Sequence, residues 1–349
     1  MPIVLLIDAL RQAQGDALGA LGFEPVECDY RVMASTPGWR LRDYGGASPS
    51  LLIVAAPIKR PSIWDLSPSA SAVRYCLSRG LRVYLLEWTR ASYSVGDGGL
   101  DEYADRAIAA CVDIVARESG APFLMGHSLG GTFAAIFAAL QPQSILGLAL
   151  LGAPLCFAEG SSRFRDAVAK MGPSLLAHGS VVPGSTLSQF CAFASPEAFV
   201  WSRMVDAALS FGDPRAAEIH ARIERWALDE VALSGRLVDQ MVQWLYCEDR
   251  FYRGTLPIRD RLIGPSAVSV PALAVVGAAD EVAPRASVAP FFEAMPTKDV
   301  RIIEYPGEAG VGLQHVAILA GRRAYAEVWP EIIEWLGAGR DGALCSRGA

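Results

Sequence analysis

Short apolar runs alternate along the chain with longer stretches in which apolar residues recur at helical spacing. The apolar runs predict strands at 51–56, 83–88, 123–125, 147–151, 272–276 and 300–305. The stretches of helical spacing predict helices at 3–21, 72–79, 101–118, 131–140 and, near the end of the chain, 323–336. Strands that alternate with helices of about ten or more residues imply βαβ units. We therefore expect an α/β fold with a mostly parallel central sheet and flanking helices.

The middle of the chain departs from this alternation. Between 155 and 269 the pattern becomes helical, with many aromatic residues and scattered Gly and Pro. We interpret this segment as a helical cap inserted into the sheet domain. The expected organisation is a core over 1–154 with an N-terminal helical extension, the cap over 155–269, the rest of the core over 270–337 and a flexible tail over 338–349.

The composition is that of a globular protein. The chain has 349 residues, of which 52% are hydrophobic and 19% charged, so it is long enough to bury a core and unlike a disordered chain. Lys and Arg number 31 against 37 Asp and Glu, a net charge of −6, and no basic run stands out. We therefore expect no nucleic-acid binding. The seven Cys lack the C-x-x-C and C-x-x-H spacings, which is typical of unpaired thiols in a reducing compartment.

The high hydrophobicity does not predict a membrane segment. The longest apolar stretches, 51–58 and 146–151, are far shorter than the ~20 residues that a helix needs to span a bilayer. The apolar run at 2–6 has no basic residue before it and is closed by Asp8 and Arg11, so it does not resemble a signal peptide. We expect a soluble, cytoplasmic protein with no integral membrane segment.

The sharpest local motif is G-x-S-x-G at 126–130, with Ser128 at its centre. It follows the predicted strand at 123–125 and precedes the Ala-rich helix at 131–140. In this strand–turn–helix context the turn exposes the serine hydroxyl as a nucleophile, and the flanking glycines let strand and helix approach closely. The backbone N–H of Leu129, at the start of the helix, is the expected first donor to an oxyanion.

A nucleophilic serine needs a histidine base and a carboxylate that orients the base, in the chain order Ser, Asp or Glu, His for this kind of turn. Among four histidines, only His315 lies beyond the last predicted strand, in a Gly-rich loop before the final helix. Asp280 follows the strand at 272–276 and is the expected acid, with Glu281 as the alternative. We expect His315 to take the proton of Ser128 while Asp280 holds the tautomer of the imidazole.

The other three histidines are not assigned to the reaction. His127 is adjacent to the serine and is expected to point elsewhere. His178 and His220 lie in the helical middle, and His220 stands among charged residues on what we interpret as a solvated helix face.

A second oxyanion donor is expected from the loop after the strand at 51–56. Pro57 has no backbone N–H, so Ile58 is the expected donor and Ala56 is the alternative. Metal and nucleotide sites are not predicted, because the sequence contains no H-E-x-x-H, no P-loop and no G-x-G-x-x-G after a first strand. We expect no metal and no other cofactor.

Several blocks outside the Ser128 turn point to a known family. They are Leu51-Leu52-Ile53-Val54, Trp64-Asp65-Leu66-Ser67-Pro68, Val83-Tyr84-Leu85-Leu86-Glu87-Trp88, Gln243-Trp244-Leu245-Tyr246 with Arg253-Gly254, and Glu327-Val328-Trp329-Pro330. In this order, over most of 45–337, the chain resembles the polyhydroxyalkanoate synthases, especially the shorter, two-subunit type. The resemblance implies a cytoplasmic α/β-hydrolase core with a mobile cap that acts on 3-hydroxyacyl thioesters of coenzyme A. By position, the family's nucleophile, acid and histidine fall at Ser128, Asp280 and His315.

The chain departs from these synthases at the nucleophile, where they carry Cys in G-x-C-x-G and this chain carries Ser128. A Cys acyl-enzyme is a thioester, and its thiol is a good leaving group with a pKa of ~8.5. A Ser acyl-enzyme is an oxygen ester, from which transfer to another alcohol is nearly thermoneutral while water is in excess. The expected loss is polymerisation, and cleavage of the acyl-enzyme by water remains. Gln314 is a second departure, because the family usually has Gly before this histidine.

Three functions are compatible with these residues. The first is a serine hydrolase that cleaves carboxylic (thio)esters through a Ser acyl-enzyme, with hydroxyacyl or polyester-type substrates. The second is a synthase-like acyltransferase that uses 3-hydroxyacyl-CoA with Ser as the nucleophile. The third is a non-catalytic, granule-associated or heteromeric partner, and the complete Ser–His–Asp set argues against it.

The expected partner is therefore a small-molecule ester or acyl-CoA substrate, or a polyester, and the sequence leaves a homodimer open. The surroundings of Ser128 discriminate between these substrates: an apolar cavity favours lipid or polyester esters, whereas a basic mouth favours CoA. The candidate contacts for CoA phosphates are Arg253, Arg259, Arg261 and Arg285.

Overall fold

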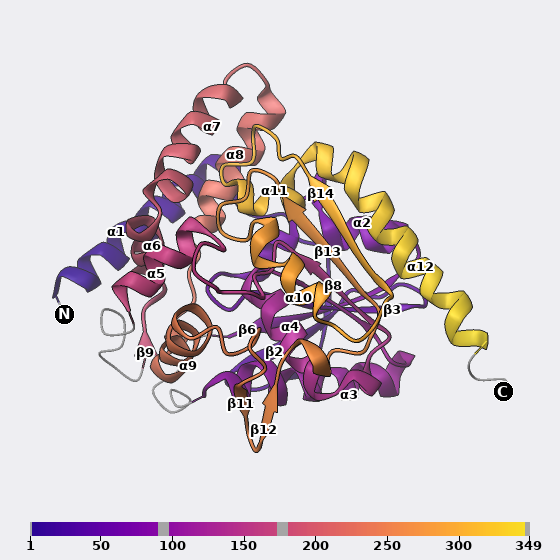
Figure 1. Cartoon of the computed structure of the whole chain (residues 1–349). Coiled ribbons are helices and arrows are strands. Elements are labelled where there is room, and N and C mark those ends of the chain that lie inside the picture. Colours follow the sequence, from indigo (N-terminus) through magenta and orange to yellow (C-terminus); the bar gives the residue numbers. More distant parts are fainter. Residues whose placement is uncertain (1, 90–97, 173–180, 346–349) are drawn as a thin grey trace.

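A computed structural model describes residues 2–89, 98–172 and 181–345 of the chain (Figure 1). Its centre is a twisted sheet in the order β1-β2-β6-β3-β7-β8-β13-β14. The strands are β1 (Arg31–Ser35), β2 (Trp39–Asp43), β3 (Ser50–Val54), β6 (Arg82–Trp88), β7 (Phe123–His127), β8 (Gly147–Leu151), β13 (Ala272–Gly277) and β14 (Val300–Tyr305). Neighbouring strands from β6 to β14 pair in parallel, whereas β2 pairs antiparallel with both β1 and β6. The mostly parallel sheet predicted from the sequence is confirmed.

Helices flank this sheet. They include α2 (Ala72–Ser78), η3 (Glu102–Arg106), α3 (Ala107–Ser119), α4 (Leu129–Leu140), α10 (Ala289–Glu293), α11 (Ala317–Ala320), η11 (Ala324–Val328) and α12 (Trp329–Cys345). Every residue of α4 is buried, and its Gly and Ala residues let it lie directly against β7 and β8. A helix that is apolar on all sides belongs in the centre of a protein. The start of α4, and with it Ser128, is therefore fixed by the core.

The segment between β8 and β13 is mainly helical. It contains α5 (Arg163–Met171), α6 (Gly184–Ala194), η6 (Glu197–Trp201), α7 (Ser202–Ser210), α8 (Pro214–Ala227), α9 (Gly235–Gln240) and η7 (Met241–Cys247). Two short antiparallel pairs interrupt it: β9 (Val181–Val182) with β10 (Leu233–Ser234), and β11 (Leu256–Ile258) with β12 (Arg261–Ile263). The apolar periodicity did not predict these pairs, because each strand is only two or three residues long. The division of the chain into core and cap stays a prediction.

The N-terminal helix α1 (Pro2–Leu18) packs against this middle segment, with contacts to α6 and α8 (Figure 1). It is followed by η1 (Gly19–Phe23), in which Gly22 has a φ of 90° and ends the helical path. The helical extension expected at the N-terminus is therefore present, and it lies beside helices that come two hundred residues later in the chain. No helix among the described residues is long and apolar enough to cross a membrane.

Two features of the sheet domain differ from the sequence expectation. The antiparallel strands β1 and β2 at one end of the sheet were not predicted, because their charged residues hide the alternation; in β2, Trp39 and Leu41 are buried together with Arg42 and Asp43. The final helix continues to Cys345, so most of the expected tail over 338–349 is helical, and 346–349 lie outside the described residues. Glycines weaken a helix but do not end it, and no proline stands in this stretch.

A buried ion pair joins β2 to β6. Arg42 Nε lies 2.8 Å from Glu87 Oε2, and both side chains are almost fully buried, while Arg42 Nη1 reaches Glu27 at 2.7 Å. Removing one member of a buried ion pair lowers the stability of the fold, because the other charge stays buried without that partner. The edge of the sheet therefore depends on a polar contact rather than on apolar packing alone.

We expect Glu87→Ala to lower the free energy of unfolding by about 3 kcal/mol, because it leaves the Arg42 guanidinium buried beside the sheet. Urea unfolding followed by circular dichroism measures the change. The double variant Arg42→Met with Glu87→Leu removes both charges and is the matched control, which should recover most of the loss. A Glu87→Ala protein as stable as wild type would contradict this role of the pair.

Candidate active site

Ser128 lies on a strained turn between the end of β7 and the start of α4. Its φ of 55° and ψ of −134° are unusual for a residue with a side chain. The backbone is fixed on both sides: Ser128 N donates to Leu151 O at 3.1 Å, and Ser128 O accepts from Gly131 N at 3.0 Å and Thr132 N at 3.1 Å. The surrounding sheet and helix thus impose the turn that presents the hydroxyl.

The glycines of the motif are required by the close approach of backbones. A Cβ at Gly130 would lie 2.2 Å from Val54 O, and a Cβ at Gly126 would lie 2.5 Å from Gly131 Cα. The start of α4 therefore lies directly against β3 and β7, as the motif predicted.

The structure brings Ser128, His315 and Asp280 together. His315 Nε2 is 2.8 Å from Ser128 Oγ, and His315 Nδ1 is 2.8 Å from Asp280 Oδ2. The other carboxylate oxygen of Asp280 accepts from the backbone N–H groups of Val282 at 2.8 Å and Ala283 at 3.1 Å. Of the two candidate acids, Asp280 is the one that contacts the imidazole.

The Asp280 carboxylate is held in its charged form. Burial opposes the charge, but the attraction and hydrogen bond of His315, with the two backbone donors, outweigh it and hold the pKa of Asp280 below its usual value. A charged carboxylate only accepts hydrogen bonds, so the proton of the neutral imidazole lies on Nδ1. His315 Nε2 is then free to accept the proton of Ser128 Oγ.

His127 supports His315 from the opposite side, a role that the sequence did not predict. Its Nε2 is 2.7 Å from the backbone oxygen of His315, and the two rings lie 4.6 Å apart between centroids. Burial, aided by the nearby His315 ring, lowers the pKa of His127 to about 3, so its ring is neutral. Since a carbonyl oxygen only accepts, Nε2 of His127 carries the proton and donates it. The available signal, which the sequence analysis did not use, was a polar residue at the end of an apolar strand.

Gln314 closes the loop that carries His315. Its Nε2 donates to Glu308 O at 2.7 Å, and its Oε1 accepts from Glu308 N at 3.2 Å. The Glu308 carboxylate in turn accepts from Tyr305 Oη and Arg323 N, both at 2.7 Å. The residue that departs from the synthase pattern therefore ties the loop to β14 and to the final helix.

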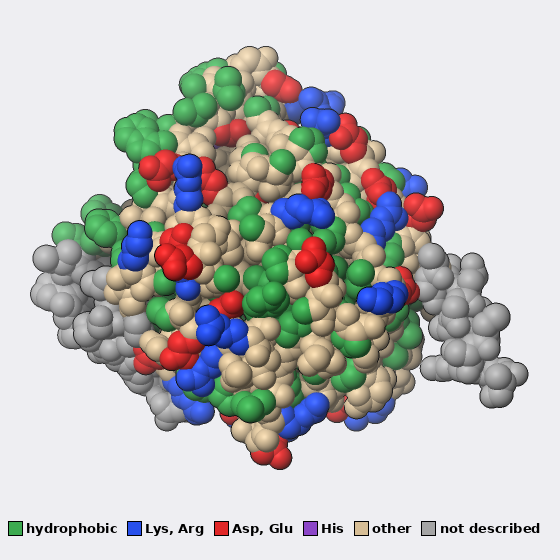
Figure 2. All heavy atoms as spheres, viewed as in Figure 1, with side chains coloured by type: hydrophobic (Ala, Val, Ile, Leu, Met, Phe, Trp, Pro, Cys, Tyr) green, Lys and Arg blue, Asp and Glu red, His purple; other side chains and the backbone are tan. Residues whose placement is uncertain are grey.

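A cavity of about 600 Å³ opens over Ser128 and His315. Most of its wall is apolar and comes from the middle segment, including Phe164, Leu187, Phe199, Ile223, Trp226 and Tyr246. The η6–α7 stretch contributes Val200 and Met204 to the wall, and the same stretch exposes hydrophobic side chains at the top of the molecule (Figure 2). The cavity thus offers an acyl group a predominantly apolar surface.

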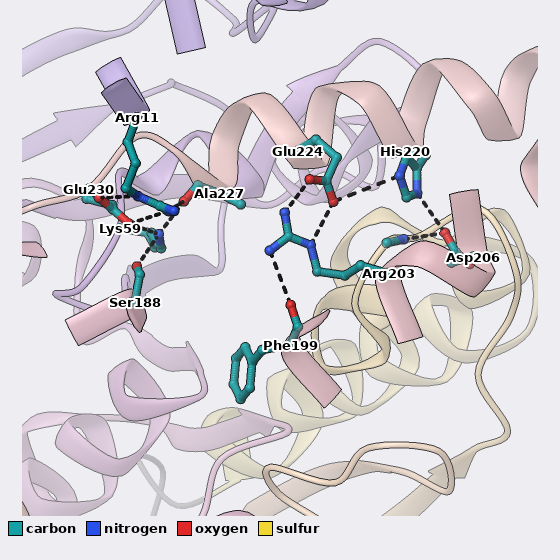
Figure 3. Close-up of polar contacts among 11 residues, drawn as sticks. Arg11, Lys59, Ser188, Phe199, Arg203, Asp206, His220, Glu224, Ala227 and Glu230 are labelled. Atoms are coloured by element: carbon teal, nitrogen blue, oxygen red, sulfur yellow. Dashed lines mark hydrogen bonds and ion pairs between the residues drawn. The ribbon is translucent and has the colours of Figure 1, made fainter. Parts of the chain in front are cut away.

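The described cavity wall has four Lys or Arg side chains: Arg11, Lys59 and Arg203 are paired as Figure 3 shows, and Arg60 Nη1 lies 3.4 Å from Glu87 Oε1. Lys59 Nζ is 3.0 Å from Glu230 Oε1, which Arg11 also contacts at 2.7 Å. Burial lowers the pKa of Lys59 to about 8, against the opposing attraction of Glu230. Arg203 donates from Nε and Nη2 to the two carboxylate oxygens of Glu224, which also lines the cavity. Each described Lys or Arg of the wall therefore has a carboxylate partner.

The expected oxyanion donors lie at the cavity. Ile58 and Leu129 both line it with Ser128, as does the alternative donor Ala56. Ile58 O accepts from Val231 N at 3.0 Å, which fixes the loop after β3 against the middle segment. The donor role of Leu129 and Ile58 stays a prediction.

The interpretation of His220 as a residue on a solvated helix face is wrong. Its side chain is 13% exposed, lines the cavity and bonds to Asp206 at 2.9 Å, because that face of α8 packs beneath the loop before His315. His178 lies outside the described residues. Among the described residues, no group of three or more His, Cys, Asp or Glu side chains is placed to hold a metal ion.

The arginines considered for CoA phosphates are absent from the described cavity wall. Arg259 pairs with Asp105 at 2.7 Å and Arg285 with Glu304 at 2.9 Å. Arg261 donates to the backbone at the end of α4. Of the two surroundings distinguished from the sequence, the structure has the apolar cavity.

Comparisons with known proteins match the fold and the sequence blocks. Residues 64–190 match the family model of the alpha/beta hydrolase fold. The chain is 28% identical over 290 residues to the poly(3-hydroxyalkanoate) polymerase subunit PhaC of Haloferax mediterranei, and 28% identical over 298 residues to that of Haloarcula marismortui. Each match covers 82% of this chain but only 58% and 60% of the two relatives.

A solved structure shows the same fold. The soluble variant of the monoglyceride lipase from Saccharomyces cerevisiae, in complex with a substrate analog, superposes with a TM-score of 0.55 at 11% identity, covering 91% of this chain and 98% of that one. The α/β-hydrolase fold and the resemblance to polyhydroxyalkanoate synthases are thereby confirmed.

The buried, neutral His127 predicts a pH dependence of stability. In the unfolded chain its imidazole binds a proton below about pH 6.5, whereas the folded protein keeps it neutral down to about pH 3. The unfolded state binds more protons in this window, so the free energy of unfolding falls as the pH falls. From pH 7 to pH 5 this group alone accounts for a loss of about 2 kcal/mol.

His127→Gln replaces the imidazole N–H donor with an amide N–H donor and removes the group that titrates. We expect the difference in unfolding free energy between pH 7 and pH 5, measured with urea, to be smaller in this variant than in wild type. Equal losses in the two proteins would show that His127 is protonated in the folded state.

Proposed function

We propose that the chain, a polyhydroxyalkanoate-synthase-like α/β-hydrolase, is a serine hydrolase that cleaves carboxylic (thio)esters through an acyl-enzyme at Ser128. The observation that carries this proposal is the position of the His315 imidazole, within 2.8 Å of both Ser128 Oγ and Asp280 Oδ2. The arrangement pairs a nucleophile with its base, and the base with the group that orients it.

In the proposed first step, Ser128 Oγ attacks the acyl carbonyl carbon and passes its proton to His315 Nε2. Asp280 stabilises the resulting imidazolium, and the backbone N–H groups of Leu129 and Ile58 donate to the oxyanion. The imidazolium then gives its proton to the leaving alcohol or thiol as the bond to the acyl group breaks. In the second step His315 takes a proton from water, the hydroxide attacks the acyl-enzyme, and the free acid leaves as Ser128 regains its proton.

The cavity favours an apolar acyl group, such as a hydroxyacyl or polyester-type substrate. Its wall is mostly apolar, and its described Lys and Arg side chains are paired with Glu230, Glu224 and Glu87. Met204 of α7 supports this preference, because it lines the cavity and is 60% exposed. An apolar ligand gains by removing such surfaces from water. The cytoplasmic location expected from the cysteine pattern stays a prediction.

A synthase-like acyltransferase is the second candidate. It is favoured by the similarity to the two archaeal polymerase subunits over 82% of this chain. Against it stands the oxygen nucleophile: an ester at Ser128 passes to a second alcohol without the driving force that a thioester supplies, while water competes in excess. We therefore place hydrolysis first.

We expect Ser128→Ala to lower the turnover of p-nitrophenyl butyrate by at least about 10³-fold, because the nucleophile is lost while the rest of the site remains. Labelling by a fluorophosphonate probe should disappear as well. Ser78→Ala, on α2 and outside the cavity, is the matched control and should react and label as wild type does. Labelling that persists in the Ser128→Ala protein would place the nucleophile elsewhere.

The converse substitution, Ser128→Cys, tests whether the nucleophile atom selects between hydrolysis and transfer. A Cys acyl-enzyme is a thioester, which a hydroxyl attacks more favourably than it attacks an oxygen ester. We expect ester hydrolysis to fall, because sulfur is larger and its bonds are longer than the preorganised site accommodates. Transfer from 3-hydroxybutyryl-CoA to an added alcohol should fall less or appear.

Both rates are measured on one preparation, and the ratio of transfer to hydrolysis is compared with that of wild type. A ratio that does not rise would show that the cavity, and not the nucleophile atom, determines the reaction class.

A further inference from the structure

A buried carboxylate on α7 binds the loop that leads to His315. Asp206 Oδ1 accepts from Gly310 N at 2.7 Å, and Asp206 Oδ2 accepts from Gly312 N at 2.6 Å. His220 Nδ1, on α8, lies 2.9 Å from the same Oδ2 (Figure 3). The side chain of Asp206 is 6% exposed, so these hydrogen bonds take the place of those that water would otherwise make to the carboxylate.

The loop is shaped to meet this carboxylate. Gly310 and Gly312 have φ values of 86° and 66°, a conformation that residues with side chains rarely adopt and that lets alternate N–H groups turn toward one anion. A Cβ at Gly310 would lie 2.6 Å from the Cβ of Ala216 on α8. The loop is therefore packed directly onto α7 and α8, without room for a side chain at this glycine.

The same carboxylate remains charged at neutral pH. Burial opposes the charge, but hydrogen bonds from His220, Gly312 and Gly310 outweigh burial and lower the pKa of Asp206. Hydrogen bonds to an ionised acceptor are about twice as strong as neutral ones. The hydrogen bonds from Gly310 and Gly312 to Asp206 are therefore stronger than bonds to a neutral acceptor, and they hold the loop to α7.

Helix α7 also forms part of the cavity wall. Arg203, Met204 and Ala207 line the cavity, and Asp206 lies on the same helix turn. Gly312 precedes His315 by three residues, and the short helical turn Gln314–Val316 begins immediately after the loop. Helix α7 therefore lines the cavity and also holds the loop that leads to His315.

We propose that Asp206 is a positioning residue that couples the seating of α7 over the cavity to the placement of His315. While α7 is seated, the loop is held and the imidazole stays within reach of Ser128 and Asp280. When α7 moves away, Gly310 and Gly312 lose their acceptor, and the base loses one of its supports. This inference rests on the proposed function, because it assigns His315 the role of the base.

The test compares Asp206→Ala and Asp206→Asn with Asp213→Ala. Asp213 is the matched control, because its carboxylate caps α8 by accepting from Arg215 N and Ala216 N and does not contact the loop. The measured quantities are kcat and KM for p-nitrophenyl acetate, the rate of fluorophosphonate labelling at Ser128, and the Tm of each protein.

We expect Asp206→Ala to lower kcat and the labelling rate by about 10- to 100-fold, since small displacements of a reacting group have effects of this size. KM should change far less. Asp206→Asn keeps one acceptor oxygen and should fall between Asp206→Ala and wild type. Asp213→Ala should lower the Tm but keep the kcat of wild type.

Two results would overturn the coupling: wild-type kcat and labelling in Asp206→Ala, or equal losses of kcat in Asp206→Ala and Asp213→Ala at equal Tm. If Asp206→Ala does not fold, amide hydrogen exchange of Asp206→Asn decides the question. Faster exchange at Gly310 and Gly312 together with reduced labelling supports the coupling, and unchanged labelling contradicts it.

Failure of the proposed function gives a different pattern. In that case wild-type protein is not labelled by the fluorophosphonate, or Ser128→Ala keeps its activity. If only the coupling is wrong, wild type is labelled, Ser128→Ala is inactive, and Asp206→Ala behaves as wild type.

Discussion

The imidazole of His315 has to satisfy two hydrogen bonds at once, from Nε2 to Ser128 Oγ and from Nδ1 to Asp280 Oδ2, each of 2.8 Å. Ser128 and Asp280 follow directly after strands of the central sheet, so the core fixes their positions. His315 instead stands in a short helical turn that follows a loop of eight residues, 306–313, after β14. The geometry of the site therefore depends on the groups that hold this loop.

Three sets of contacts supply that support. His127 donates to the backbone oxygen of His315, and the Gln314 side chain closes the loop on the backbone of Glu308. Asp206 holds two glycine N–H groups from the side of the cavity. The first two come from the sheet domain and from the loop itself, whereas the third comes from the segment that encloses the cavity. The base is thus supported both by the rigid core and by the wall against which a substrate packs.

The cavity gives the proposed chemistry its selectivity. In an apolar surrounding the attraction between His315 and Asp280 is stronger than in water, and so is any hydrogen bond to a developing oxyanion. The described Lys and Arg side chains of the wall have carboxylate partners, as Lys59 has Glu230, so they are not free to bind an anionic group. The apolar wall therefore suits the acyl part of an ester or thioester substrate.

Local sequence identified the residues at the centre of the site. Ser128 stands in a motif between a strand and a helix, Asp280 follows a strand, and His315 is the single histidine placed after the last strand, so each has a signal within a few residues. The structure brings these three together. The mostly parallel sheet was likewise predictable, because apolar runs alternate with stretches of helical spacing.

The contacts that sequence reasoning missed join distant parts of the chain. Asp206 accepts hydrogen bonds from the backbone N–H groups of Gly310 and Gly312, more than a hundred positions away. A contact through backbone groups leaves no pattern of side chains in the sequence. His220 was misinterpreted because charged neighbours on α8 resemble a solvated face, although a loop covers it. Strand β2, which lies between β1 and β6, was missed because its buried Arg42 is matched by Glu87 on another strand, and neither charge alone predicts burial.

The central claim is that this synthase-like site hydrolyses its acyl-enzyme instead of extending a polymer. The most direct measurement incubates the protein with 3-hydroxybutyryl-CoA and, separately, with p-nitrophenyl butyrate, and separates free acid from polymer at each time point. The account predicts free 3-hydroxybutyrate and butyrate, one acid for each CoA or nitrophenol released, with no polymer. Polymer that accumulates from 3-hydroxybutyryl-CoA without free acid would contradict it.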